Sequence, residues 1–253
     1  MPSWLIELPT CPSTNSWALE HAEALAHGAC VVTARQTAGR GRDGKIWVSP
    51  PGVVTASFVL HAALDDGPQL ALAAGLAICH AVEDACPGLP EPLAIKWPND
   101  VWLAGGKLAG VLCERAGPSS TQIGGAWPGP AAATWPALVV GIGLNVDPQR
   151  QELPSDRRCA ILAEHVPAPS TMALLAGLRR YLLEAAALIA DRGLEPVLGE
   201  LRRRDLLRGR MVEIDLGDRL VTGRAAGLDD HGRLLIDGAE RLAITSGTVV
   251  QFG

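Results

Sequence analysis

A glycine-rich basic segment, residues 39–45 (GRGRDGK), has the composition of an anion-binding loop. Glycines let backbone N–H groups approach a phosphate or carboxylate closely, and arginines add charge and forked donors. The spacing nearly fits a P-loop, but Ile46 stands where the magnesium-binding hydroxyl belongs, and a proline-containing stretch follows in place of a helix. The segment therefore predicts an anion site of another kind, with a solvated basic turn as the alternative.

Lys96 is the second candidate, within the run KWPND at residues 96–100. It lies near the end of an apolar strand predicted at 93–97, which Pro98 stops. A lysine held at such a rigid edge can stabilise negative charge on a phosphoryl or carboxylate group. In the alternative interpretation, Lys96 extends into solvent and Asn99 and Asp100 only form a turn.

Two further motifs place polar residues or glycines beside predicted elements. Ser13 precedes a predicted helix, and its hydroxyl can cap the helix and contact a ligand at the same time. Gly141 and Gly143 lie in a predicted strand, where glycines indicate close approach of backbone, side chain or ligand. Asn145 is a polar residue among apolar neighbours and requires a hydrogen-bond partner.

The elements that must position these residues alternate along the first two thirds of the chain. Hydrophobic patterns predict strands at 4–8, 29–34, 53–60, 93–97, 101–103, 107–114 and 138–146 and helices at 13–26, 69–85, 170–192 and 195–207. Residues 117–136, rich in glycine and proline, predict a surface loop. From Gly209 onward, five short strands at 211–216, 220–228, 233–236, 241–244 and 248–252 predict a small barrel. We expect an α/β (α+β) chain with domains at 1–207 and 208–253.

The overall composition narrows the classes of partner. The 253 residues are 48% hydrophobic and 19% charged with net charge −5, so nothing favours nucleic acid or an anionic membrane. The apolar stretch at 70–82 is too short to span a bilayer, and the N-terminus has no basic region of a signal peptide. The six cysteines form no CxxC pair and predict reduced thiols. We expect a cytoplasmic protein with no DNA or membrane partner and no resident metal site.

Taken together and in this order, the motifs resemble those of the biotin protein ligase family. The resemblance covers about residues 3–150 strongly and the terminal strands weakly, and GRGR together with KWPND is its most specific part. The matching segments are Ser13-Thr14-Asn15, residues 36–42 with Trp47, residues 96–100, residues 107–114 (KLAGVLCE) and residues 141–146 (GIGLNV).

The resemblance implies a mixed-sheet catalytic domain of the biotin/lipoate ligase type followed by a small SH3-like β-barrel, without an N-terminal DNA-binding domain. It implies an ATP-dependent ligase that forms biotinoyl-5′-AMP and transfers biotin to a lysine of a biotin carboxyl carrier protein. ATP would bring Mg²⁺ on its phosphates. Neither step needs a protein nucleophile, so catalysis would consist of positioning and charge stabilisation. A homodimer through edge strands is left open.

The resemblance also assigns roles to residues of this chain. Lys96 and Arg42 would be catalytic, and Trp47 would stack on or shield the adenine. Asp43 departs from the family pattern, in which arginines continue the loop. Biotin would contact Ser13, Thr14, Asn15, Gln36, Gly39, Arg40, Arg42, Lys96 and Gly110, and ATP would contact Arg40, Arg42, Trp47, Lys96, Asn99, Lys107 and Asn145.

Two alternatives remain on the same fold. A lipoate or octanoate ligase would require an apolar tunnel, whereas the polar side chains of Ser13, Thr14 and Gln36 favour biotin. A non-catalytic ligand-binding homologue is the other alternative, and the presence of Lys96 and Arg42 argues against it.

Overall fold

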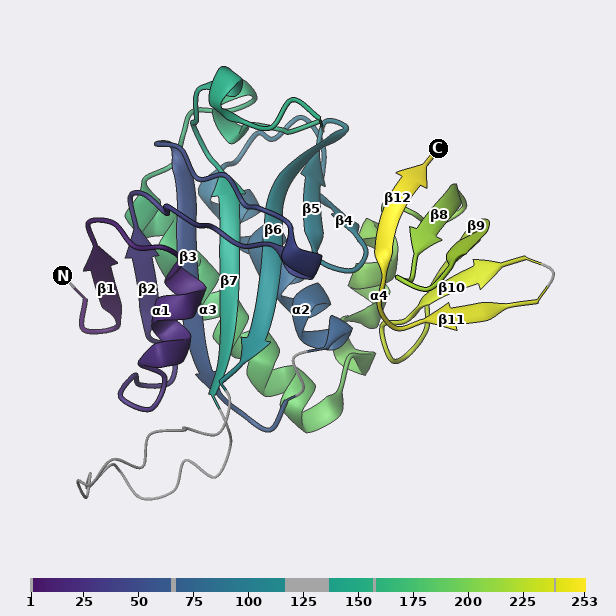
Figure 1. Ribbon diagram of the computed structural model, residues 1–253, viewed down its shortest axis with the longest axis horizontal. Coiled ribbons are helices and arrows are strands. Elements are labelled where there is room, and N and C mark those ends of the chain that lie inside the picture. Colours follow the sequence, from purple (N-terminus) through teal and green to yellow (C-terminus); the bar gives the residue numbers. More distant parts are fainter. Residues whose placement is uncertain (1, 65–66, 117–136, 157, 239) are drawn as a thin grey trace.

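A mixed sheet of seven strands forms the centre of the larger part of the chain (Figure 1). The structure is a computed structural model that describes residues 2–64, 67–116, 137–156, 158–238 and 240–253. The strand order is β1-β2-β3-β7-β6-β5-β4, and β1 and β2 are parallel whereas the other neighbours are antiparallel. The strands are β1 (Leu5–Leu8), β2 (Cys30–Thr33), β3 (Val53–His61), β4 (Ala94–Lys96), β5 (Asp100–Leu103), β6 (Gly106–Arg115) and β7 (Ala137–Asn145).

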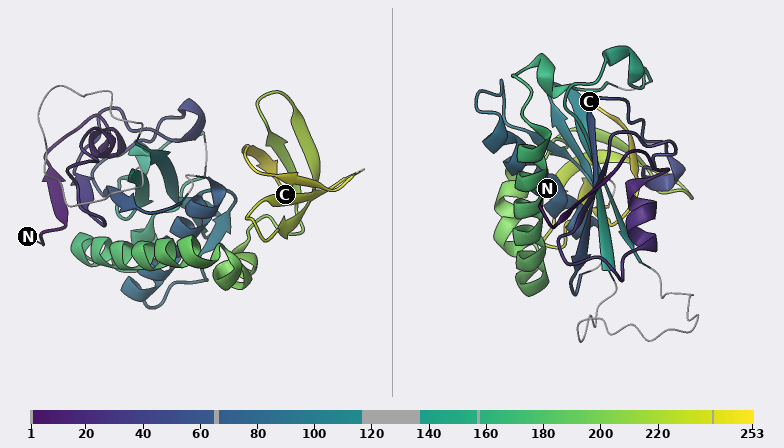
Figure 2. Two further views of the ribbon diagram at one scale, coloured as in Figure 1. Left: turned by 90° about the horizontal axis from the view of Figure 1, so that it is seen from below. Right: turned by 90° about the vertical axis from the view of Figure 1, so that its left-hand side faces the viewer.

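Helices cover the two faces of this sheet unequally. The long helices α2 (Pro68–Ala85) and α3 (Thr171–Arg192) pack together on one face, and the short α1 (Thr14–Glu20) lies on the other (Figure 2). Helix α2 is buried almost all round because the sheet lies on one side of it and α3 on the other. The face that carries only α1 is therefore left partly open, and the cavity described below lies there.

Helix α1 is shorter than its pattern predicts, and the predicted end near residue 26 is wrong. Ser13 Oγ caps the helix by accepting from the Ser16 N–H, as expected. The helix ends at Glu20, where the His21 ring stacks on Trp17 and hydrogen-bonds its carbonyl oxygen. Tighter turns follow, with the Ala24 N–H bonded to His21 O. Local side-chain contacts therefore end a helix that the alanine-rich pattern would continue.

The C-terminal strands form a second, antiparallel sheet with the order β11-β10-β9-β8-β12. It lies at one end of the molecule beyond α4 (Glu195–Arg204), with β12 close to β4 (Figures 1 and 2). The Trp97 indole N–H, which donates to Gly232 O at 3.1 Å, joins the two parts. The strands are β8 (Met211–Asp215), β9 (Leu220–Leu228), β10 (Leu234–Asp237), β11 (Leu242–Ile244) and β12 (Thr248–Phe252).

The expected fold class is confirmed, namely a mixed α/β sheet followed by a small SH3-like antiparallel unit. The prediction of a surface loop at 117–136 falls outside the described residues. Helix α4 ends at Arg204, three residues earlier than the predicted 207, where Asp205 turns the chain into an extended conformation. In the ranges that the structure describes, no helix is both long enough and apolar enough to cross a bilayer.

Candidate active site

A cavity of about 620 Å³ lies between the open face of the large sheet, the loop at 40–47 and the second sheet. Its floor follows a row of residues that are partners across the strands: Thr55, Gly143, Gly110, Asp100 and Lys96. Such partners project toward the same face of a sheet, so the row runs from β3 to the ammonium group on β4. The register thus places Lys96 and the glycine motif, far apart in sequence, on one surface.

Glycines on this floor let side chains lie directly against the strands. A Cβ added to Gly141 would lie 2.2 Å from Asn15 Oδ1, and one added to Gly143 would lie 2.2 Å from the Trp47 ring. Both distances are too short for any side chain, which explains why glycine occupies these positions. The close approach predicted from the two glycines is confirmed, and the groups that approach are Asn15 and Trp47.

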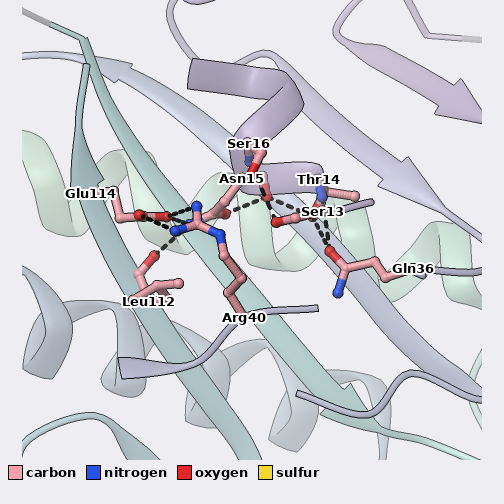
Figure 3. Close-up of polar contacts among 9 residues, drawn as sticks. Ser13, Thr14, Asn15, Ser16, Gln36, Arg40, Leu112 and Glu114 are labelled. Carbon is pink, nitrogen blue, oxygen red and sulfur yellow. Dashed lines mark hydrogen bonds and ion pairs between the residues drawn. The ribbon is translucent and has the colours of Figure 1, made fainter. Parts of the chain in front are cut away.

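One end of the cavity is lined by buried, uncharged side chains that hydrogen-bond to one another; Figure 3 shows these contacts beside the Arg40–Glu114 ion pair. The Thr14 N–H donates to Gln36 Oε1 at 2.8 Å, and Gln36 Nε2 donates to Ser49 Oγ at 3.1 Å. Ser57 Oγ lies 2.8 Å from Thr14 Oγ1 and 2.5 Å from Asn15 Oδ1. These groups hold one another in place without a ligand, and we call them, together with Ser13, the acid-binding end.

The side chain of Arg40 forms an ion pair with a carboxylate on the large sheet. Its guanidinium binds both carboxylate oxygens of Glu114 on β6, at 2.9 and 2.8 Å, and Glu114 also accepts from Asn15 Nδ2 at 2.8 Å (Figure 3). Glu114 was not among the predicted site residues, although it lies in the matching segment 107–114. Ser57 and Thr55 were missed too, and the signal for them is polar residues that alternate along an otherwise apolar strand.

The opposite end of the cavity is cationic, and Lys96 lies at its centre. Lys96 Nζ donates to Val249 O at 3.2 Å and lies 4.9 Å from the Phe252 ring centroid. Burial lowers the pKa of the Lys96 ammonium, the Asp100 carboxylate opposes this shift, and the charges of Lys107 and Lys45 add to it. An anion bound here would therefore meet a cation that has little water around it.

Arg42 and Lys45, the cationic residues of the loop at 40–47, hydrogen-bond to residues of the C-terminal part of the chain. Arg42 Nη2 donates to Ser246 Oγ at 3.4 Å, and Lys45 Nζ donates to Thr248 Oγ1 at 3.3 Å. Thr248 Oγ1 in turn donates to Asp43 Oδ2 at 3.0 Å. The segment around Thr248 therefore closes the cationic end from the side opposite the loop, and we call this region, with Lys96, the phosphate end.

Lys107 and Asn99 also line the cavity, and each already has a partner. Lys107 Nζ lies 2.6 Å from Asp100 Oδ1 and 5.5 Å from the Trp47 ring centroid. Asn99 Nδ2 donates to Val111 O at 2.7 Å. Trp47 Nε1 and Thr55 Oγ1 are buried and have no hydrogen-bond partner among the described residues.

Two predicted site residues lie outside the cavity lining. Asn145 is buried, and its Nδ2 donates to Lys107 O and Ala160 O, at 3.3 and 3.2 Å. The hydrogen-bond partners predicted for Asn145 are thus backbone carbonyl oxygens. Gly39 is buried beneath the loop, and its carbonyl accepts from the Trp47 N–H at 3.0 Å. The other predicted site residues all line the cavity, namely Ser13, Thr14, Asn15, Gln36, Arg40, Arg42, Trp47, Lys96, Asn99, Lys107 and Gly110.

Comparisons with known proteins identify the family to which the chain is similar. The family model described as "Biotin/lipoate A/B protein ligase family" matches residues 8–125, and "Biotin protein ligase C terminal domain" matches residues 208–250. The biotin--[acetyl-CoA-carboxylase] ligase of Mycobacterium tuberculosis is 34% identical over 247 residues, which cover 94% of this chain and 85% of that protein. The ligase of the same name from Paracoccus denitrificans is 33% identical over 248 residues, covering 95% and 97%.

Solved structures extend the likeness to three dimensions. The biotin protein ligase of Aquifex aeolicus in complex with biotin and ATP aligns with a TM-score of 0.78 and 29% identity, over 98% of this chain and 97% of that one. Similarity in sequence and in fold thus extends over nearly the whole chain. The chain belongs to the biotin/lipoate A/B protein ligase family.

Proposed function

We propose that this chain is an ATP-dependent biotin protein ligase, which activates biotin as biotinoyl-5′-AMP and transfers it to a lysine of a biotin carboxyl carrier protein. The observation that carries the proposal is one cavity with a neutral, hydrogen-bonding end and a cationic end, joined by a glycine floor. A carboxylic acid with a polar head group fits this arrangement when its carboxylate meets a nucleotide phosphate. Relatives named biotin--[acetyl-CoA-carboxylase] ligase support the same reaction.

The acid-binding end favours biotin over lipoate or octanoate. Ser13, Thr14 and Gln36 place hydroxyl and amide groups at the acid-binding end of the cavity, where a urea group can exchange hydrogen bonds with them. A dithiolane ring or an alkyl chain offers no such partner, so binding it there would leave these buried groups unsatisfied. We therefore assign the urea of biotin to this end.

In the first step, a carboxylate oxygen of biotin forms a bond to the α-phosphorus of ATP while the bond to pyrophosphate breaks. Lys96 and Arg42 are the cations that we assign to the negative charge that gathers at phosphorus. In the second step, the carrier lysine, as a neutral amine, attacks the acyl carbon, AMP leaves, and the new amide loses a proton. Neither step requires covalent participation by this chain.

The remaining assignments complete the proposal. Asn99, Lys107 and Trp47 would face the nucleotide, and Mg²⁺ on the ATP phosphates would neutralise part of their charge. Asp43 also lines the phosphate end, where its negative charge would oppose that of the phosphates. We assign residues 1–207 to the catalytic domain and residues 208–253 to a unit that completes the cavity, since Gly247, Thr248, Val249 and Val250 line it.

ATP–pyrophosphate exchange tests the proposal directly. We expect exchange that depends on biotin and is not supported by lipoate or octanoate at the same concentration. Titration calorimetry with each acid, without nucleotide, measures binding separately from chemistry. Exchange supported by lipoate or octanoate rather than biotin would reverse the substrate assignment. Biotin binding without any exchange would indicate a non-catalytic binding protein.

A further inference from the structure

The Lys96 ammonium group lies close to one aromatic ring from each sheet. Lys96 projects from β4, and its Nζ donates to Val249 O of β12 at 3.2 Å. The same nitrogen lies 5.7 Å from the ring centroid of Trp102 on β5 and 4.9 Å from that of Phe252 on β12. Both distances are within the range in which the face of an aromatic ring attracts a cation.

The register of the large sheet accounts for the position of Trp102. Trp102 follows Asp100 by two residues on β5, and its partner Ala94 precedes Lys96 by two residues on β4. Side chains two positions apart on a strand project toward the same face, so Trp102 lies diagonally beside Lys96 on the open face. The Trp102 Nε1 is buried and has no hydrogen-bond partner among the described residues, so packing rather than a hydrogen bond positions this indole.

Phe252 approaches Lys96 from the second sheet. Its backbone pairs with Val212 of β8, and its ring packs against Trp102 with centroids 5.4 Å apart and an interplanar angle of 78°. This edge-to-face arrangement is one that aromatic pairs prefer. The two rings therefore support each other across the boundary between the sheets, and we call Trp102 and Phe252 the aromatic clamp.

The aromatic clamp counters the effects that favour movement of the Lys96 ammonium group into solvent. Lysine has a flexible side chain and a strongly hydrated charge, and the charges of Lys107 and Lys45 disfavour a third cation nearby. Asp100 attracts Lys96, but its carboxylate is already paired with Lys107 at 2.6 Å. The negative faces of the two rings add attraction without bringing water, so they favour an ammonium group that stays in the cavity.

We propose that Trp102 and Phe252 are positioning residues for the reaction, which hold the Lys96 ammonium group at the phosphate end before a nucleotide binds. The inference rests on the proposed function, because Lys96 acts there on the charge that gathers at phosphorus. Phe252 does not line the cavity, so its influence on the reaction passes through Lys96 and Trp102. The α-phosphate then meets a cation that is already in place, and no reorganisation of this side chain is needed during the reaction.

Substitutions at position 252 separate the attraction by the ring face from the bulk of the side chain. Leucine keeps an apolar side chain without a π face, whereas tyrosine keeps the ring. For Phe252→Leu we expect kcat/KM for ATP in biotin-dependent pyrophosphate exchange to fall about fivefold to thirtyfold, as for loss of a desolvated cation–π contact. Phe252→Tyr should stay within about threefold of wild type, and biotin affinity without nucleotide should change much less than exchange in both variants. Equal exchange in the leucine and tyrosine variants would overturn the proposal.

A double-mutant cycle with Lys96→Ala shows whether Phe252 acts through the ammonium group. The loss caused by Phe252→Leu should largely disappear in the Lys96→Ala background, because no cation remains for the ring to hold. An equal loss in both backgrounds would indicate general support of the fold and would overturn the proposal.

Trp102→Leu and Trp4→Leu give a matched comparison that remains available if Phe252→Leu does not fold. The Trp4 ring centroid lies 5.4 Å from Arg179 Cζ, outside the cavity lining. We expect Trp102→Leu to lower kcat/KM for ATP about fivefold or more in the native background but not beside Lys96→Ala, and Trp4→Leu to change it less than threefold. Equal values for the two tryptophan variants would overturn the proposal. A wild-type chain without biotin-dependent exchange would instead refute the proposed function.

Discussion

The two ends of the cavity differ in how much of their arrangement exists without a ligand. At the acid-binding end, Ser13, Thr14 and Asn15 are 3%, 2% and 4% exposed. Thr14 and Asn15 are hydrogen-bonded to Gln36, to Ser57 on β3 and to Glu114 on β6. At the phosphate end, Arg42 is half-buried and Lys45 is exposed. The side chain of Arg42 donates to Ser246 at 3.4 Å and that of Lys45 donates to Thr248 at 3.3 Å, both in the second part of the chain.

The contrast indicates that the two ends have different tasks: the acid-binding end is suited to binding, and the phosphate end to charge stabilisation. Buried polar groups without partners are costly, so the acid-binding end must be satisfied internally and is consequently preorganised. Exposed cations remain hydrated and lose little without an anion, so the phosphate end does not need to be satisfied internally. Lys96 combines both properties, since it is a cation held in a fixed, desolvated position.

The largest effect should come from Lys96→Ala. Removing one preorganised charge from the reacting centre should lower the rate of biotin-dependent ATP–pyrophosphate exchange by about 10²–10³-fold. Biotin binding without ATP should weaken much less than the exchange rate, because the urea contacts lie at the other end and only the carboxylate of biotin loses a partner. Lys45→Ala serves as the matched control, since that lysine is exposed and should cost much less. A near-wild-type exchange rate in Lys96→Ala would show that the phosphate end is organised by other groups.

Gly141→Ala should disrupt the other end. The new Cβ would lie 2.2 Å from Asn15 Oδ1, so the Asn15 side chain, which extends from α1, must move away from β7. We expect biotin affinity to fall about tenfold or more, as expected when a buried hydrogen-bonded group is displaced. Gly67→Ala meets no atom within 4 Å and is the control for a harmless glycine substitution. Calorimetry would decide, and full affinity in Gly141→Ala would mean that Asn15 does not need its present position.

The pH dependence of exchange should reveal the lowered pKa of Lys96. Burial lowers this pKa, so the ammonium loses its proton at a pH below that of an ordinary lysine. The charged form stabilises the reaction, so kcat/KM should fall as the pH rises through this lowered value. Lys96→Arg remains charged, and its alkaline limb should move to higher pH whatever its absolute activity. Superimposable alkaline limbs in the two proteins would assign the titration to another group.

Asp43→Asn should have the smallest effect. Asp43 adopts φ 55°, a left-handed conformation that asparagine also tolerates, and the new amide oxygen can still accept from Thr248. Loss of one exposed negative charge beside Arg42 and Lys45 should lower KM for ATP by about two- to threefold at low salt, and the gain should shrink as salt increases. KM for ATP, measured at two ionic strengths, checks this prediction. Biotin affinity should not change and serves as the control. A rise in KM would indicate that Asp43 helps to bind the nucleotide.

The sequence alone determined the order of strands and helices and the small C-terminal antiparallel unit, and eleven of the thirteen residues it assigned to a site line the cavity. Composition and periodicity are local properties, and the glycine–arginine loop and the strand that ends at Lys96 carry their chemistry within a few residues. The same local signals suggested a long helix after Ser13, which a contact between His21 and Trp17 ends early.

Only the tertiary structure decided which polar groups meet. Asn15 and Glu114 are 99 positions apart in sequence, and their contact depends on the register between β6 and β7 and on the absence of a side chain at Gly141. The sequence showed that Asn145, polar in an apolar strand, needs a hydrogen-bond partner, but only the fold identified the backbone carbonyls of Lys107 and Ala160 as partners. Hydrogen-bond partners of buried groups are set by packing across strands, and that information is not contained in the neighbours of a residue along the chain.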